Sequence, residues 1–392
     1  MPVLFLIVVV DLIGFGIIIP LLPFYAEYYQ ATPAQVGLLM AVYSAAQFIS
    51  APFWGRLSDR VGRRPVLLGT ILAAALSYIW LGLADTLITL FAARAMGGLM
   101  AGNISTAFAY AADVTTRENR AKGMGMIGAA FSIGFILGPA IGGILAGDDP
   151  ANADFRTPSF AAAGLSALAF VLGLVMLKES LSAEAKARIA AQSRVARMKA
   201  LGDALRTPGI GILLVLSFLA TFVFAGLEST FAMWSRRQFG WGPEQNGYLF
   251  AFIGILAATI QGGLIGRLAT KFGVERLIFA GALALTIGLG WIPFVGSVPE
   301  LVAAMTVAAL GFSVTTPALN TAISVRGESD IQGGLMGVTR SATTLSRMTG
   351  PAIAGATFGF IGLHSPYYAG AAIMLIVTVI AFVALLTKPR PG

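Results

Sequence analysis

The stretch GRLSDRVGRRP, from Gly55 to Pro65, decides the fold because it places a cluster of charges between two long apolar segments. The whole sequence is 57% hydrophobic and only 11% charged, so charged stretches of this kind are few. A second, altered copy, GRLATKFGVER, begins at Gly266 and again lies between two apolar segments. Two copies of one loop in a chain of this composition predict a duplicated membrane protein.

The apolar segments recur along all 392 residues, and the mean hydropathy of the chain is +0.83. Each segment has roughly 20 residues, which is long enough to cross a hydrocarbon layer of about 30 Å. Backbone polar groups inside a bilayer must be satisfied within the protein, so segments of this kind form helices. The sequence therefore predicts an all-α integral membrane protein with twelve transmembrane helices.

The longest polar stretch falls near the middle of the chain and divides it into two halves. Residues 1–178 are predicted to form an N-terminal half of six helices, and residues 209–392 a C-terminal half of six helices. Residues 179–208 are rich in alanine and basic residues, which favours a helix. We expect this cytoplasmic linker to be amphipathic and to lie on the anionic leaflet. A linker helix that only joins the halves is the alternative.

The orientation follows from the distribution of basic residues. Loops on one side, with the C-terminal tail, hold 20 of the 26 Lys and Arg residues. Those of the opposite side are Arg156, Arg236 and Arg237. Basic loops stay in the cytoplasm, so both termini are predicted to be cytoplasmic in a bacterial inner membrane. The formal charge of +8 reflects this bias and gives no reason to expect a nucleic-acid partner.

The first loop reads G-x-x-x-D-R-x-G-R-R and resembles the signature loop of the major facilitator superfamily. Gly55 and Gly62 are expected to allow tight turns, and Asp59 to accept hydrogen bonds or to face a helix N-terminus. The second copy has Thr270 at the place of Asp59. The resemblance implies a conformational latch between the halves, made of Gly55, Asp59, Arg60, Gly62, Arg63 and Arg64. A loop that only supplies positive charge to the cytoplasmic side is the alternative.

A glycine-rich segment of the fifth span, GMIGAAFSIGFILGPAIGG, resembles the antiporter motif of the same superfamily. It contains Gly134, Gly138, Pro139, Gly142 and Gly143. Proline bends a helix, and the glycines let a neighbouring helix approach closely. The resemblance implies an exporter rather than a symporter, and an ordinary glycine-rich membrane helix is the alternative.

Span one, DLIGFGIIIPLLP from Asp11 to Pro23, resembles the first helix of drug:proton antiporters of the tetracycline-resistance type. Arg94 in span four matches a superfamily motif with a buried arginine that is linked to proton transfer. Tetracycline antiporters carry a further acid in span three, where this chain has Ser77. Because span nine also lacks an acid, we expect a broader or different amphipathic substrate than a metal–tetracycline chelate.

Two carboxylates, Asp11 and Glu228, fall within predicted spans. Charged residues inside a membrane are costly and usually functional, and burial favours the protonated form of a carboxyl group. Either acid is therefore a candidate proton carrier. The alternative for Asp11 is a structural hydrogen bond to a neighbouring helix. The alternative for Glu228 is a solvated position near the outer interface.

Arginines within or at the edge of spans are Arg94, Arg340 and Arg347. We assign Arg94 and Arg347 to proton coupling, because a buried arginine stays charged and can promote proton release from a nearby acid. Arg347 could also hold an anionic group of a substrate, or only complete a structural pair. Arg340 could extend to the cytoplasmic surface.

The remaining polar and aromatic side chains within spans supply candidates for substrate contact. Phe224 flanks Glu228 at helical spacing and could line a cavity for a flat aromatic ligand. Hydrogen bonding between helices is the alternative for each amide. The full set of candidates is Gln47, Asn103, Phe224, Phe231, Gln261, Asn320 and Thr343.

These observations predict proton-coupled efflux of drug-like amphipathic molecules, with tetracycline-like compounds among the candidates, by alternating access. The expected partners are a small-molecule substrate, protons and membrane lipids, and the expected state is a monomer. No cofactor, metal or enzyme activity is expected, since the single histidine, His364, lies in an outer loop and cysteine is absent. A proton-coupled transporter of a sugar or organic acid, and a ligand or lipid sensor that does not transport, remain alternatives.

Overall fold

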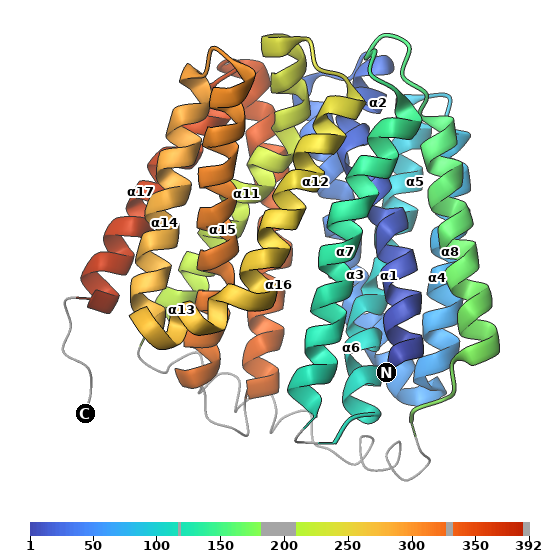
Figure 1. Ribbon diagram of the computed structural model, residues 1–392. Coiled ribbons are helices and arrows are strands. Elements are labelled where there is room, and N and C mark those ends of the chain that lie inside the picture. Colours follow the sequence, from blue (N-terminus) through green and yellow to red (C-terminus); the bar gives the residue numbers. More distant parts are fainter. Residues whose placement is uncertain (117–118, 182–208, 327–331, 387–392) are drawn as a thin grey trace. The chain divides into compact units, whose positions relative to one another are not determined.

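The computed structural model describes residues 1–116, 119–181, 209–326 and 332–386, and these are helical without any β-strand (Figure 1). Before residue 182 the helices are α1 (Pro2–Ile18), η1 (Ile19–Leu21), α2 (Leu22–Tyr28), α3 (Pro33–Val61), α4 (Arg63–Gly82), α5 (Leu87–Met100), η2 (Ala101–Asn103), α6 (Ile104–Asp113), α7 (Arg120–Ala146) and α8 (Arg156–Met176). After residue 208 they are α11 (Ile210–Phe239), α12 (Pro243–Thr259), η3 (Ile260–Leu264), α13 (Ile265–Phe272), α14 (Val274–Trp291), η4 (Ile292–Phe294), α15 (Val298–Arg326), α16 (Gln332–Phe360), α17 (Ser365–Ala381) and η5 (Phe382–Leu386).

The predicted all-helical membrane fold is confirmed, and the helix count is close to the prediction. Within the described residues, 11 helices are long and apolar enough to cross a membrane. The helix α16 has 29 residues but carries two arginines and many hydroxyl groups, and it occupies the place of the remaining predicted span. The amphipathic helix predicted for the linker falls on residues 182–208, which lie outside the described part of the chain.

The chain divides into two compact units whose limits differ from the predicted halves. The first contains Met1–Gln192 and Ala232–Gly254, and the second contains Ser193–Phe231 and Ile255–Gly392. The ends of α11 and α12 that adjoin residue 240 therefore belong to the first unit. The prediction had placed both helices wholly in the C-terminal half.

Close helix packing in the first unit follows from its glycines. Figure 1 shows α1, α7 and α8 side by side. A Cβ added at Gly14 would lie 3.1 Å from the carbonyl oxygen of Ala162 on α8. Pro20 and Pro23 each remove a backbone donor, so the regular α-helix of span one is interrupted after α1. The span continues as η1 and α2. Asp11 therefore lies on α1, a helix that packs against both α7 and α8.

The ends of α11 and α12 join the first unit through ion pairs and backbone contact. Glu27, near the end of α2, accepts from Arg236 at 3.0 Å and from Arg237 at 2.8 Å. A Cβ at Gly247 of α12 would meet the carbonyl oxygen of Pro139 on α7. These contacts explain why the ends of α11 and α12 that adjoin residue 240 group with the first unit.

The second unit is also packed through small residues. A Cβ at Gly350 of α16 would meet the carbonyl oxygen of Phe222 on α11, and one at Gly226 would lie 3.1 Å from Cβ of Ala354. The helices α14 and α15 approach in the same way at Gly288, where a Cβ would lie 2.5 Å from the backbone nitrogen of Ala308. These close approaches keep the backbones of α11 and α16 near each other, so that side chains of the two helices can pair.

Candidate functional site

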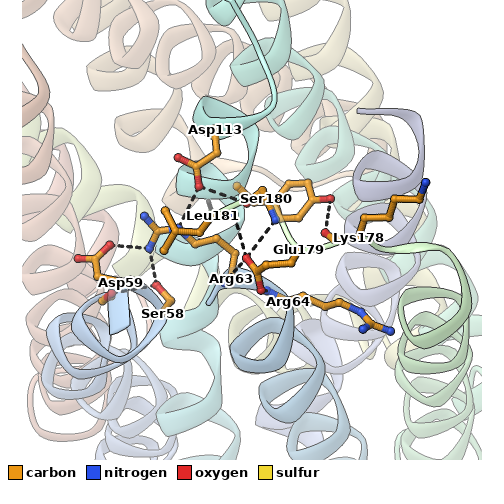
Figure 2. Close-up of polar contacts among 11 residues, drawn as sticks. Ser58, Asp59, Arg63, Arg64, Asp113, Lys178, Glu179, Ser180 and Leu181 are labelled. Carbon is orange, nitrogen blue, oxygen red and sulfur yellow. Dashed lines mark hydrogen bonds and ion pairs between the residues drawn. The ribbon is translucent and has the colours of Figure 1, made fainter. Parts of the chain in front are cut away.

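The loop from Gly55 to Pro65 takes part in a network of ion pairs centred on Arg63 (Figure 2). Its guanidinium donates to Asp59 at 2.6 Å and to Asp113, at the end of α6, at 3.1 Å. The side chain of Arg63 is 6% exposed, whereas those of Asp59 and Asp113 are 34% and 24% exposed. Arg63 also donates to the hydroxyl of Ser58 at 2.7 Å. One buried cation therefore joins the end of α3, the start of α4 and the end of α6.

Glu179, three residues after the end of α8, caps the N-terminus of α4. Its carboxylate accepts the backbone N–H of Arg63 at 2.9 Å and that of Arg64 at 3.1 Å, as Figure 2 shows. The N–H groups of Ser180 and Leu181 donate to the same carboxylate, each at 3.0 Å. Burial alone would raise the pKa of Glu179, but the four backbone hydrogen bonds together lower it below its ordinary value.

One expectation for this loop needs correction. Gly55 was expected to allow a tight turn, but it lies within α3 in a helical conformation, because the helix continues to Val61. The turn is made by Gly62 alone, whose φ is 122°. Asp59 accepts a hydrogen bond from Arg63, which is the first of its two predicted roles, and Glu179 fills the other by facing the helix N-terminus. Arg60 is exposed and makes no ion pair within the described residues.

The second copy of the loop keeps the turn, and the described residues around it form no network like that of Arg63. Gly273 has a φ of 83° between α13 and α14. The hydroxyl of Thr270 donates to the carbonyl of Gly266 within its own helix at 3.0 Å. The ion pair near this turn joins Glu275 to Arg326 at 3.7 Å, with both side chains about one third exposed.

The glycines of the fifth span form the close contact surface that their spacing predicts. Cβ atoms at Gly134 and Gly138 would lie 2.7 Å from the carbonyl oxygen of Leu12 and 2.5 Å from the backbone of Gly16. One at Gly142 would meet the carbonyl oxygen of Ile17, so the three glycines fit against span one. Gly143 faces α12 instead, where a Cβ would lie 2.8 Å from the carbonyl oxygen of Pro243, and Pro139 lies within the helix.

Asp11 lies in α1 and its carboxylate accepts a hydrogen bond from the hydroxyl of Ser166 on α8 at 2.9 Å. It also borders a cavity of about 30 Å³ between α1, α4, α6 and α7. Asp11 is the one charged residue among the described residues that line this cavity. The cavity has room for a water molecule. Asp11 therefore has a neutral hydroxyl partner and a polar position at the edge of an apolar space.

Arg94, on α5, is 4% exposed and stacks on an aromatic ring. Its guanidinium carbon lies 4.3 Å from the ring centroid of Tyr43. Tyr43 in turn contacts Phe15, one turn after Asp11, with ring centroids 5.3 Å apart. Within the described residues Arg94 has no ion pair, and its Nε has no hydrogen-bond partner. Arg94 is thus linked through Tyr43 to Phe15, which lies on the same helix as Asp11.

Glu228 and Arg347, predicted separately, form an ion pair between α11 and α16. The guanidinium Nη1 of Arg347 donates to the Glu228 carboxylate at 3.4 Å. The side chain of Glu228 is 10% exposed and that of Arg347 is 38% exposed. Charge-assisted hydrogen bonds of this type are usually 2.7–2.9 Å long, so this pair is loose and its carboxylate lies behind the arginine.

The candidates for substrate contact are placed differently from one another. Gln47 donates to the carbonyl of Ala101 at 3.1 Å, as its alternative predicted. The hydroxyl of Thr343 donates to the carbonyl of Arg340 at 3.0 Å, and Gln261 and Asn320 are exposed. The side chain of Asn103 lies outside the described residues.

The two phenylalanines of this set also differ. Phe224 is half-buried and stacks on Phe312 of α15, with ring centroids 3.8 Å apart. Phe231 is 0% exposed. A fully buried ring offers no surface to a ligand, so Phe231 is removed from the candidate site.

The sequence model described as Major Facilitator Superfamily matches residues 4–265 and 256–392 of this chain. The chain belongs to the major facilitator superfamily. It is 31% identical to multidrug resistance protein 2 of Bacillus subtilis (strain 168), over 94% of this chain and 90% of that protein. It is 33% identical to the class E tetracycline resistance protein of Escherichia coli, over 88% of this chain and 85% of that protein. The solved structure of the human organic anion transporter MFSD10 (TETRAN) is 26% identical, with a TM-score of 0.72, and the match covers 97% of this chain and 98% of that one.

In this member of the superfamily, the residues that sequence reasoning missed are mostly partners of those it found. Asp113, Glu179 and Ser166 each complete an interaction of a predicted residue. The signal for Asp113 and Glu179 was their position at the ends of spans, near a loop with four arginines. Ser166 gave no signal, because a serine inside a membrane helix usually bonds its own backbone.

Proposed function

We propose that this protein exports drug-like amphipathic molecules from the cytoplasm in exchange for external protons, by alternating access. The observation that carries this proposal is a carboxylate within a span, Asp11, which has a neutral hydroxyl partner. The whole-length similarity to multidrug and tetracycline resistance proteins supports the direction of transport and the substrate class.

We assign the proton to Asp11 rather than to Glu228. A hydroxyl can donate to a carboxylate and can accept from a carboxylic acid, so Ser166 serves both states of Asp11. Arginine only donates, so Arg347 matches the ionised form of Glu228 alone. The cavity beside Asp11 has room for about one water molecule, which could exchange a proton with the carboxylate.

The proton gradient supplies sufficient energy for this exchange. One charge that moves through about 100 mV releases about 2.3 kcal/mol. That energy supports a substrate gradient of roughly fiftyfold, since a tenfold ratio corresponds to about 1.4 kcal/mol.

The substrate range is proposed to be broader than tetracycline. Ser77 stands where tetracycline antiporters carry an acid, and Asp11 and Glu228 are the two acids of the predicted spans. The similarity to a human organic anion transporter adds anionic compounds to the candidates.

We further propose a monomer in the bacterial cytoplasmic membrane with both termini in the cytoplasm. Transport would need no cofactor beyond the proton gradient. Accessibility of cysteines introduced near Met1 and at the tail to an impermeant thiol reagent tests the orientation, and labelling from the periplasm would overturn it.

The experiment that tests the function is uptake into inside-out membrane vesicles with an imposed proton gradient. Tetracycline, a lipophilic cation and an amphipathic anion are supplied in turn. We expect the parent to accumulate at least one of them, collapse of the gradient to abolish accumulation, and Asp11→Asn to abolish it without loss of folded protein. Undiminished accumulation by Asp11→Asn would refute the assignment of Asp11. Accumulation that survives collapse of the gradient, or no accumulation at all, would refute proton-coupled drug export.

A further inference from the structure

The helix α16 has two exposed faces of opposite character. Arg340 is exposed, and Arg347, seven residues later, is rotated from it by only about 20°. The exposed apolar residues Leu345 and Ile353 lie about 140° to either side of Arg340. An apolar exposed face fits lipid, whereas intramembrane charges face a water-accessible space. The face with the arginines therefore points toward a water-accessible space.

We define the cationic stripe as Arg340, Thr343, Thr344 and Arg347, the polar residues within about 60° of Arg340 on this face. Arg340 has no ion pair within the described residues of its unit. Arg347 makes one loose contact, with Glu228, and its other donors have no hydrogen-bond partner among the described residues. The stripe therefore carries two cations against one carboxylate.

The depth of the groups decides what a ligand meets first. Arg347 is 38% exposed, and Glu228 behind it is 10% exposed. A cation that approaches the stripe encounters two guanidinium groups before it can reach the carboxylate. An anion encounters planar forks of donors that match a carboxylate or sulfonate bidentately.

An apolar surface lies beside the charged pair. Phe224, one turn before Glu228 on α11, stacks on Phe312 of α15 and is half-buried. An aromatic molecule with an anionic group could therefore place its ring near the phenylalanines and its charge on the arginines. Substrate pockets commonly combine apolar walls with a few fixed polar groups.

We propose that the cationic stripe of α16 is an anion-binding subsite, and that amphipathic anions are a substrate class of this protein. This inference rests on the proposed function for its transport role. Glu228 is the internal competitor of the ligand, because it occupies the guanidinium of Arg347 when no anion is bound. Arg340 is not paired with Glu228, so its guanidinium is available to an anion whether or not Glu228 contacts Arg347.

The test is equilibrium binding of two fluorescent probes to the full-length protein in detergent, followed by anisotropy. Fluorescein is an anion and rhodamine 123 is a cation, and both share the xanthene ring system. We expect fluorescein to bind at least tenfold more tightly than rhodamine 123. Arg340→Gln should weaken fluorescein binding about tenfold, and Arg340→Lys should weaken it less.

The matched control is Arg156→Gln, which removes the same charge from an exposed position at the start of α8. It should leave the binding of both probes unchanged. Glu228→Gln should strengthen fluorescein binding, because it releases Arg347, and a purely structural pair would not produce that gain. Arg347→Gln leaves Glu228 unpaired, so Arg340→Gln carries the test if that variant unfolds.

Equal or tighter binding of rhodamine 123, no binding of either probe, or unchanged fluorescein binding in Arg340→Gln would each overturn the subsite. The outcome of the binding experiment and the outcome of the vesicle transport experiment are independent of each other. Arginine-dependent binding of fluorescein by a protein that exports nothing would retain the subsite and refute the proposed function. Export of cations alone, without fluorescein binding, would retain the proposed function and refute the subsite.

Discussion

The two copies of the charged loop share a backbone but not a set of interactions. In the first copy Gly62 makes the turn with φ 122°, and Arg63 is 6% exposed between two aspartates. In the second copy Gly273 makes the turn with φ 83°, and Val274 stands at the place of Arg63. A turn between two helices therefore needs only the glycine. Among the described residues the ion-pair network belongs to the first copy, as expected if one half of the chain supplies the latch.

The largest expected effect comes from removing the centre of the first network. Arg63→Ala leaves Asp59 and Asp113 without their cation, and breaking a buried pair costs about 3 kcal/mol when the acids are partly exposed. We expect a clear fall in the thermal unfolding midpoint in detergent and loss of export. Val274→Ala, the equivalent change in the second copy, should cost no more than about 1 kcal/mol. Equal losses in the two variants would remove the distinction between the copies.

A smaller effect is expected when the two turn glycines are replaced by alanine. Both positions have positive φ, and strain of this kind costs about 1–3 kcal/mol. A Cβ at Gly62 would also meet the carboxylate of Glu179. Gly62→Ala should therefore destabilise the protein by about 1 kcal/mol more than Gly273→Ala, since the cap is lost as well. Chemical unfolding of the two variants side by side measures this difference, and a larger loss in Gly273→Ala would contradict it.

Glu179→Gln should cost about 1 kcal/mol near neutral pH, the usual contribution of a charged cap. The pKa of Glu179 is lowered in the folded protein, so its stabilisation is complete above the ordinary range of a glutamate. It is lost as the pH falls through the lowered pKa. We expect the stability difference between parent and variant to shrink on acidification. A difference that stays constant down to acid pH would show that the charge of Glu179 contributes nothing.

The smallest effect should follow from restoring the missing acid in the second copy. Thr270→Asp supplies a carboxylate, but position 274 holds valine where Arg63 would be needed. We expect a change in stability within about 0.5 kcal/mol, as for other exposed substitutions. Thr270→Asp combined with Val274→Arg tests whether the pair is sufficient. A marked gain from Thr270→Asp alone would mean that another cation already completes the second copy.

The sequence predicted the membrane fold and the duplication because hydropathy and the repeated loop are local signals. It predicted the close contact of the fifth span for the same reason, since small residues at helical spacing define a contact surface. It did not predict the unit boundary within α11 and α12. That boundary depends on Glu27, Arg236 and Arg237, which lie far apart in the chain and gave no common pattern.

The candidate site was predicted residue by residue but not as pairs. Glu228 and Arg347 were identified as costly intramembrane charges, and a cost of this kind says that a partner exists without naming it. Gly55 was interpreted wrongly because a glycine can lie in a helix as well as in a turn. Phe231 was included because its helical spacing from Phe224 was correct, although spacing does not report depth of burial.

Proton release by the purified, detergent-solubilised protein on addition of substrate tests whether Asp11 carries the proton that is exchanged for substrate. Tetracycline, rhodamine 123 and fluorescein are added in turn to the parent, Asp11→Asn and Glu228→Gln in weakly buffered solution. We expect the parent and Glu228→Gln to release protons with at least one compound, and Asp11→Asn to release none. Proton release by Asp11→Asn equal to that of the parent would contradict this expectation.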